Sequence, residues 1–300
     1  MEANYARGDN MYARTDLAME EQELWRRSAG EQTELSGVWA RTNERRGIRT
    51  TVVKILDENG ARQLRKPVGT YLTLELGALA RRERSAFARS AYALAAELRR
   101  LTAGCESVLV AGLGNDAVTP DAVGPLTLRS LIVTRHLKSA RLAGLEGFRD
   151  VSAVQPGVLG TTGVESVELV RGAAERVRPQ MVLVVDALAA REPERVCKTV
   201  QLADFGIVPG SGVGNSRAAF NEQTLGVPVL AIGVPTVVDA AGLADESGKT
   251  GNFHNCISGM VVTPRDIDAR VREIARLIGY SIDLALHRGL TLEEIPCFLA

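Results

Sequence analysis

MVLVV, at positions 181–185, is the segment that decides the fold of this chain. Five consecutive apolar residues rich in valine are typical of a strand buried on both faces, as in a parallel sheet. Similar runs predict further strands at 107–113, 151–156, 196–202 and 227–234. Helix-forming stretches alternate with them, at 78–102, 120–136, 162–177 and 264–287. This alternation predicts an α/β fold, in which helices cover both faces of a mostly parallel, twisted sheet.

Before this alternating region, the chain has a small β-rich subregion at about 34–76. GIRTTVVKIL and TYLTLEL are rich in β-branched residues, and Asp57–Gly60 predicts a turn between two strands. Residues 1–33 are polar with little periodicity, so we expect a loosely held N-terminal segment. No repeat or interdomain linker interrupts the rest, which predicts a single domain.

Composition excludes several classes of function. Lys+Arg and Asp+Glu both number 36 among 300 residues, and this balance argues against direct nucleic-acid binding. No run approaches the ~18 apolar residues of a membrane helix, and the polar N-terminus lacks the apolar centre of a secretory signal. We therefore expect a cytoplasmic protein without membrane partners. The four cysteines form no CxxC pair, so we expect neither disulfides nor a zinc site.

Polar and glycine residues follow four of the predicted strands. These segments are GLGN and TPDAVGP after the first strand, DALAAR after MVLVV, PGSGVGN at 209–215 and PTVVD at 235–239. Ligands in open α/β sheets bind beyond the carboxyl ends of strands. We therefore expect the segments after all four strands at one edge of the sheet, with Asn115, Gly212, Asn215 and Asp239 lining the site.

Two carboxylates stand out, and each has two interpretations. Asp186 directly follows five apolar residues, where desolvation should raise its pKa, but it could also cap a turn or helix. Asp121 could complement a helix that Thr119 caps and Pro120 begins, and the same pattern recurs at Thr263. If the two carboxylates face each other, one activates water and the other protonates the leaving group.

Other chemistries have weaker signals. The chain has no GxSxG motif of a serine hydrolase. His136 and His287 fall near predicted helix C-termini, where they suit the dipole, and His254 has no metal-ligand spacing around it. GSGVG at 210–214 breaks the dinucleotide-loop spacing and is more typical of close backbone approach, as in a peptide groove. We expect no metal and no cofactor.

Taken together, the segments resemble the germination proteases of spore-forming bacteria. The matching stretches are RTDLA at 14–18, GLGN at 112–115, TPDAVGP at 119–125, LIVTRHL at 131–137, GFR at 147–149, VSAVQPGVLGTTGVE at 151–165, VDALAAR at 185–191, GIVPGSGVGN at 206–215, EQTLGVPVLAIGVPTVVDA at 222–240 and VTPRDID at 262–268. They are collinear and cover most of the chain, which makes the resemblance highly specific.

The resemblance implies an atypical aspartic endopeptidase with a fold similar to that of the hydrogenase-maturation proteases. It implies a homotetrameric zymogen in the cytoplasm of the forespore and spore core, whose substrates are small acid-soluble spore proteins. The family's catalytic carboxylates carry over to Asp121 and Asp186. Two alternatives stay open: a metal-recognising maturation protease of the same fold, and a non-catalytic nucleotide-binding module that uses GSGVG.

The zymogen expectation points to a cleavage site near the N-terminus. In RTDLA an acid precedes a large apolar residue and alanine, which is similar to the family's substrate sites, where Glu precedes an apolar residue and Ala. We therefore expect cleavage between Asp16 and Leu17, with a propeptide at 1–16 and a peptidase domain at 17–300. Alternatively, Asp16 caps a short helix that begins LAMEEQEL.

Overall fold

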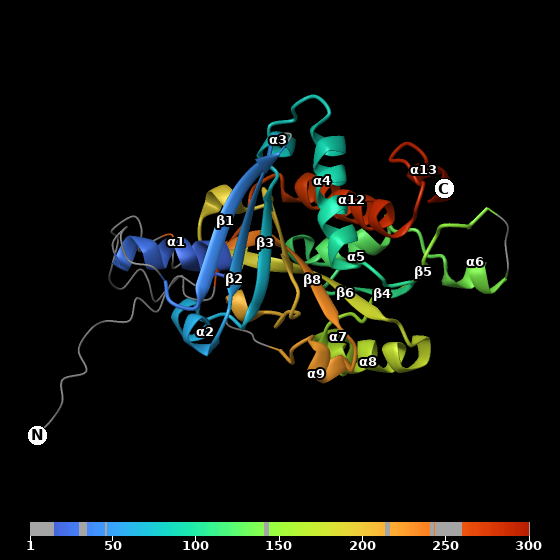
Figure 1. Ribbon diagram of the computed structural model, residues 1–300, viewed down its shortest axis with the longest axis horizontal. Coiled ribbons are helices and arrows are strands. Elements are labelled where there is room, and N and C mark those ends of the chain that lie inside the picture. The colour runs from blue at the N-terminus through green and yellow to red at the C-terminus, as the bar shows by residue number, and fades with distance from the viewer. Residues whose placement is uncertain are drawn as a thin grey trace, which may run out of the picture.

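Strand β6 (Met181–Ala190) contains the MVLVV segment and runs through the middle of one large sheet (Figure 1). The computed structural model describes residues 15–29, 35–45, 47–140, 144–213, 217–240, 243 and 260–299. The other strands of the described residues are β1 (Val38–Arg45), β2 (Ile48–Ile55), β3 (Gly69–Glu75), β4 (Ser107–Gly112), β5 (Asp150–Val154), β7 (Thr199–Ala203), β8 (Val229–Asp239) and β9 (Val261–Val262).

The strands are ordered β1-β2-β3-β7-β8-β6-β4-β5, and β9 pairs with β8. Strands β8, β6, β4 and β5 are parallel to one another, as expected for strands buried on both faces. The β-rich subregion joins the same sheet, because β3 pairs antiparallel with β7. The prediction of an α/β fold is therefore confirmed, and the sheet combines a parallel half with an antiparallel half.

Helices cover both faces of this sheet (Figure 1). The helices are α1 (Ala18–Ala29), α2 (Glu58–Leu64), α3 (Gly77–Ala80), α4 (Ala86–Leu101), α5 (Val123–Leu128), α6 (Arg135–Ser139), α7 (Leu159–Thr162), α8 (Ser166–Val177), α9 (Glu222–Leu225), α12 (Ile267–Leu286) and α13 (Ile295–Phe298), with 3-10 turns η1 (Thr119–Asp121), η2 (Pro193–Arg195) and η3 (Ser211–Val213). Helices α4, α5 and α12 pack together on one face, and α8 packs on the other. Within the described ranges, no helix combines the length and apolarity that a membrane crossing requires.

Several local predictions of secondary structure were wrong, and hydrogen bonds explain two of them. The expected turn at Asp57–Gly60 is instead the start of α2, because the Asp57 carboxylate accepts the Gly60 N–H at 2.9 Å. The expected helix at 120–136 is broken into η1, α5 and α6. The chain leaves helical geometry where the Ile132 N–H donates to Asp283 in α12, at 3.0 Å. The helices expected at 78–102 and 162–177 are each divided in two.

The N-terminal segment also differs from the prediction. Residues 1–33 were expected to be loosely held, but α1 packs against β2 and β3 and Leu17 is fully buried. Glu20 holds the start of α1 in place. Its buried carboxylate accepts the N–H groups of Arg191 and Glu192 at 2.8 and 3.1 Å and lies 3.3 Å from Arg195 Nε. Residues 1–14 lie outside the described part of the chain.

Candidate active site

Strand alternation determines which side of the sheet Asp186 faces. Val182 and Val184 pack in the apolar cluster beneath α8, and Asp186 is the next residue on that side of β6. Asp186 was expected just beyond the strand, but β6 continues to Ala190 and the carboxylate lies within it, only 5% exposed. The interpretation that Asp186 caps a turn or a helix is wrong, because Asp186 lies inside a strand.

Close backbone packing brings Asp121 to the same side. After β4, the Leu113 N–H donates to the carbonyl of Val185 in β6, at 2.9 Å. A Cβ on Gly124 would lie 2.3 Å from the Leu113 oxygen, and one on Gly114, whose φ is +106°, would lie 2.0 Å from the Asp121 oxygen. Only glycine fits at either position. The loop is thereby held against β6, and its Asn115 N–H donates to Asp121 Oδ2 at 2.7 Å.

Asp121 and Asp186 both line a cavity of about 490 Å³. Burial raises the pKa of Asp121, and the Asn115 N–H lowers it. Burial also raises the pKa of Asp186 well above its ordinary value. The negative charge of Asp121 raises it further, the Ala187 N–H opposes this, and the charge of Asp16 adds a smaller increase. The two carboxylates are thus electrostatically coupled, and both favour the protonated form more than an ordinary carboxyl does.

Asp16 also lines this cavity, and its main-chain and side-chain polar atoms are bound. Its N–H donates to the Ala189 carbonyl at 3.0 Å, its carbonyl accepts from Gln201 Nε2 at 3.1 Å, and its carboxylate accepts from Ser211 Oγ at 2.6 Å and the Ala189 N–H at 2.9 Å. The interpretation that Asp16 caps α1 is wrong, because this carboxylate is bound by β6 and η3. The helix that it was expected to cap does form.

The peptide bond between Asp16 and Leu17 is held on both sides. Gln201 donates to the Asp16 carbonyl, and its Oε1 accepts the Ala18 N–H at 2.9 Å, so one amide group spans Leu17. Lys66 Nζ donates to the Thr15 carbonyl at 2.7 Å. The residues on both sides of the predicted cleavage site are therefore fixed by two side chains far away in the sequence, Gln201 in β7 and Lys66 between α2 and β3.

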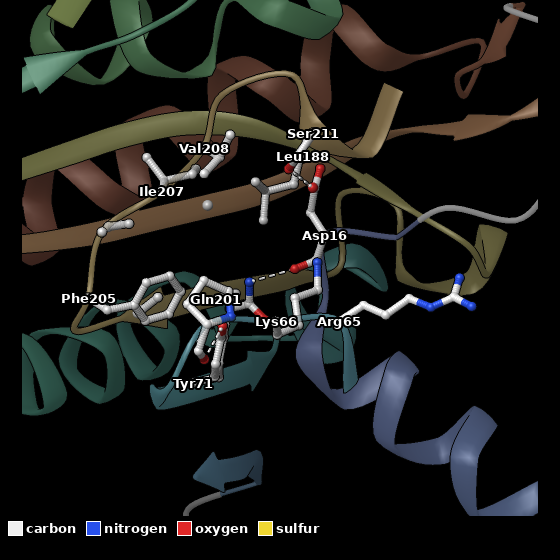
Figure 2. Close-up of a pocket in the computed structure, with 15 residues that line it drawn as sticks. Asp16, Arg65, Lys66, Tyr71, Leu188, Gln201, Phe205, Ile207, Val208 and Ser211 are labelled. Atoms are coloured by element: carbon white, nitrogen blue, oxygen red, sulfur yellow. Dashed lines mark hydrogen bonds between the residues drawn. The ribbon is translucent and has the colours of Figure 1, made fainter. Parts of the chain in front are cut away.

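A second cavity, of about 190 Å³, adjoins the first at Asp16 and Leu188, which line both. Figure 2 shows Tyr71 and Phe205 on one side of it and Ile207 and Val208 near its other end. The two rings contact each other with centroids 4.8 Å apart. This smaller cavity is mainly apolar and lies on the side of Asp16 where Gln201 projects.

The structure places two of the four other predicted site residues at the site. Asn115 lines the large cavity, and Gly212 lies against Asp16, since a Cβ there would be 2.2 Å from Asp16 Oδ2. Asp239 ends β8, beyond the lining residues Thr236 and Val237, and is not part of the cavity wall. Asn215 lies outside the described residues.

The expectation that four strands deliver these segments to one edge is wrong for β7. That strand is antiparallel to β8, so its carboxyl end points to the opposite edge. The following chain returns to the site, because Ile207 and Phe220 pair and η3 contacts β6.

The capping interpretation of Asp121 holds only in part, because Pro120 and Asp121 lie in the first turn of η1 but Thr119 does not cap it. Thr119 donates its hydroxyl to Asp268 at 2.8 Å and caps nothing, and Thr263 likewise donates to the Thr236 carbonyl at 2.8 Å.

His287 ends α12 as expected, but burial lowers its pKa to about 4, so it is neutral at pH 7 and adds no charge to the dipole. Over the residues that the structure describes, no three of His, Cys, Asp and Glu gather as a metal-binding group.

Sequence reasoning missed Ser211 and Gln201. Gln201 is a polar residue inside the apolar run VCKTVQL, which is a usable signal, because a buried amide requires hydrogen-bond partners. Ser211 carried no separate signal, since it lies within a glycine-rich loop whose approach to Asp16 depends on the fold.

Comparison with known proteins gives a consistent result. The family model described as Germination protease matches residues 13–249, which is most of the chain. A germination protease of Caldanaerobacter subterraneus subsp. tengcongensis is 42% identical over 94% of this chain and 96% of its own length. One of Clostridium tetani is 37% identical over 96% of this chain and 100% of its own length.

Among solved structures, the chain is similar to a [NiFe] hydrogenase maturation protease, HycI from Thermococcus kodakarensis KOD1. The TM-score is 0.35 and the sequence identity 19%, over 62% of this chain and 98% of that chain.

Proposed function

We propose, from the premise that this chain belongs to the germination protease family and is a peptidase, that it is an endopeptidase that uses Asp121 and Asp186 as its catalytic pair. The observation that carries the proposal is their common cavity, which Asp16, the residue before the predicted cut, also lines. The substrates we propose are small acid-soluble spore proteins, cleaved during spore germination.

The two carboxylates would act as one unit. Because burial and mutual repulsion raise the pKa of Asp186, the pair retains one shared proton at a pH where two ordinary carboxyls would have lost both. The ionised carboxylate removes a proton from water as the water oxygen bonds to the peptide carbonyl carbon. The protonated carboxyl then gives its proton to the leaving nitrogen as the C–N bond breaks.

We further propose that the protein is made as a zymogen that removes residues 1–16. The docked position of Asp16 supports this, because its carbonyl is already bound by Gln201 beside the coupled carboxylates. The segment that is cut would also occupy the cavity until it leaves, and this keeps other peptides out. The family resemblance further supports a homotetramer in the forespore and spore-core cytoplasm.

The test is incubation with a purified small acid-soluble spore protein, followed by mass spectrometry of the fragments. We expect one or a few cuts on the carboxyl side of acidic residues, and none with Asp186→Asn. Random fragmentation, or the same cuts with that variant, would contradict the proposal. A thermal shift with ATP or NAD separates the nucleotide-binding alternative, since only a ligand of the folded state stabilises it.

A further inference from the structure

The acidic side chain of Asp16 is bound by neutral groups. Ser211 Oγ donates to Oδ1 at 2.6 Å (Figure 2). The Ala189 N–H donates to Oδ2 at 2.9 Å, so each carboxylate oxygen has its own donor. Hydrogen bonds from neutral donors to a charged acceptor are stronger than neutral pairs and depend on geometry. The arrangement therefore fits a carboxylate at this position better than an apolar side chain.

Gly212 makes room for that carboxylate. A Cβ at this position would lie 2.2 Å from Asp16 Oδ2, 2.6 Å from Asp16 Cγ and 2.8 Å from the Ala189 Cβ. The φ of Gly212 is not in the left-handed region, so its backbone conformation does not require glycine. The lack of space for a Cβ does. The carboxylate of Asp16 therefore fits at this place only because Gly212 has no side chain.

The main chain of Asp16 is positioned by the same strand. Its N–H donates to the carbonyl of Ala189, whose own N–H holds the carboxylate. Because β6 also carries Asp186, three residues before Ala189, one rigid strand fixes both the acidic side chain and a catalytic carboxylate. Recognition of the side chain therefore sets the position of the peptide bond that follows it.

We infer that Ser211, the Ala189 N–H and the bare Cα of Gly212 form the specificity pocket for an acidic residue on the amino side of the cleaved bond. The inference rests on the proposed function, because it takes Asp16 as the residue before the cut. It assigns Ser211 as the specificity-determining side chain, with Asp- or Glu-containing peptides as the ligand class.

The experiment uses the full-length protein after mild acidification has removed residues 1–16, as checked by N-terminal sequencing, and two synthetic peptides. One has the sequence of residues 10–24, and the other carries alanine at the position of Asp16. We expect Ser211→Ala to lower kcat/KM for the acidic peptide about 10- to 100-fold, the effect of one hydrogen bond to a charged group, and to leave the alanine peptide nearly unchanged. Ser139→Ala is the matched control, because that hydroxyl donates to Arg135 within its own helix. It should alter neither peptide.

Gly212→Ala gives the complementary test. The added methyl group should fill the space of the carboxylate, so that the preference shifts from the acidic peptide to the alanine peptide. Equal losses for both peptides in Ser211→Ala, with an unchanged melting temperature, would overturn the pocket assignment and leave the protease proposal standing. Failure of the processed wild-type protein to cut either peptide would overturn both.

Discussion

Gln201 and Asp186 lie on the same side of the sheet, separated by Gly233 alone. Gln201 in β7 and Asp186 in β6 both pair with Gly233 in β8, so the three residues form one row across adjacent strands. Gly233 has no side chain in this row, and a Cβ there would lie 2.3 Å from Leu188 Cδ1. The Leu188 side chain therefore takes the space over β8 that a side chain at position 233 would need, between the strands that carry the amide and the carboxylate.

The catalytic proposal predicts the effect of neutralising each carboxylate. Asp121→Asn and Asp186→Asn should each lower proteolysis by about 10²–10⁴-fold, the usual contribution of general acid–base catalysis. Fragment formation from a spore-protein substrate measures this. The double variant should lose no more than the worse single variant, because the pair acts as a unit. Near wild-type turnover in a well-folded single variant would remove that residue from the mechanism.

Asp186→Asn should also change stability in a pH-dependent manner. The folded pKa of Asp186 lies above its unfolded value, so the wild-type protein loses stability as pH rises from about 4 through the folded pKa. The amide cannot ionise and avoids this loss. Denaturant titrations should therefore show the variant gaining relative to wild type as pH increases. A constant difference between pH 4 and 8 would argue against a buried, ionising Asp186.

The zymogen proposal predicts a cut between Asp16 and Leu17. Mild acidification and dehydration should trigger it, because lower pH favours the singly protonated state of the carboxylate pair. N-terminal sequencing should then find a chain that begins Leu17-Ala18-Met19. The Asp186→Asn protein should stay uncut, and cleavage in that variant would indicate a contaminating protease. An unprocessed terminus in active enzyme would contradict the zymogen proposal.

Gln201 should influence the rate of this processing. Gln201→Met keeps the length of the side chain and removes both the donor to the Asp16 carbonyl and the acceptor for the Ala18 N–H. Two neutral hydrogen bonds correspond to roughly a tenfold slower cut. Intact-mass time courses measure the rate, and a melting curve checks the fold. An unchanged rate would mean that these contacts only dock the segment.

The buried pair of His287 and Asp283 predicts acid sensitivity away from the active site. Their Nε2 and Oδ1 atoms lie 3.9 Å apart, and the His287 ring stacks on Phe148 at 4.4 Å. Because the folded pKa of His287 is lowered from 6.5 to about 4, stability should fall as pH drops through this window, by about 3 kcal/mol at most. His287→Phe should remove this dependence, as measured by denaturant titration.

Asp283→Asn serves as the matched control for that experiment. Burial raises the pKa of Asp283, so this carboxyl destabilises the fold as pH rises and opposes the histidine. Its replacement should make the rise of stability between pH 4 and 6.5 steeper, while the amide oxygen still accepts the Ile132 N–H. Identical slopes for the two variants and the wild type would contradict the shifted pKa values of His287 and Asp283.

Assembly is tested most simply by light scattering. A homotetramer predicts a mass four times that of the 32.2 kDa chain. Strand β1 forms one edge of the sheet and exposes Trp39, and it is where a crosslinking experiment should begin. A concentration-independent monomer mass would contradict the expected tetramer.

The sequence alone indicated the parallel half of the sheet and pointed to Asp121 and Asp186 as candidate site residues. Runs such as MVLVV are apolar on both faces, and only a strand covered by helices on both sides buries them. Asp186 could be selected because an ionisable group next to such a run is desolvated. Asp121 followed from its position after a predicted strand and from the family resemblance. The glycines of GSGVG at 210–214 also indicated close backbone approach, because glycine leaves space that a side chain would fill.

Only the tertiary structure decided the direction of β7, the position of Asp16 and the roles of Ser211 and Gln201. Each depends on pairing between residues far apart in the chain, such as Gln201 with Gly233 or Asp16 with Ala189. Local propensity contains no information about these partners, because hydrogen-bond register between distant strands is set by how the whole core packs. The same physics explains why residues 15–29, in a polar segment expected to be loose, instead pack against the sheet, with Leu17 fully buried.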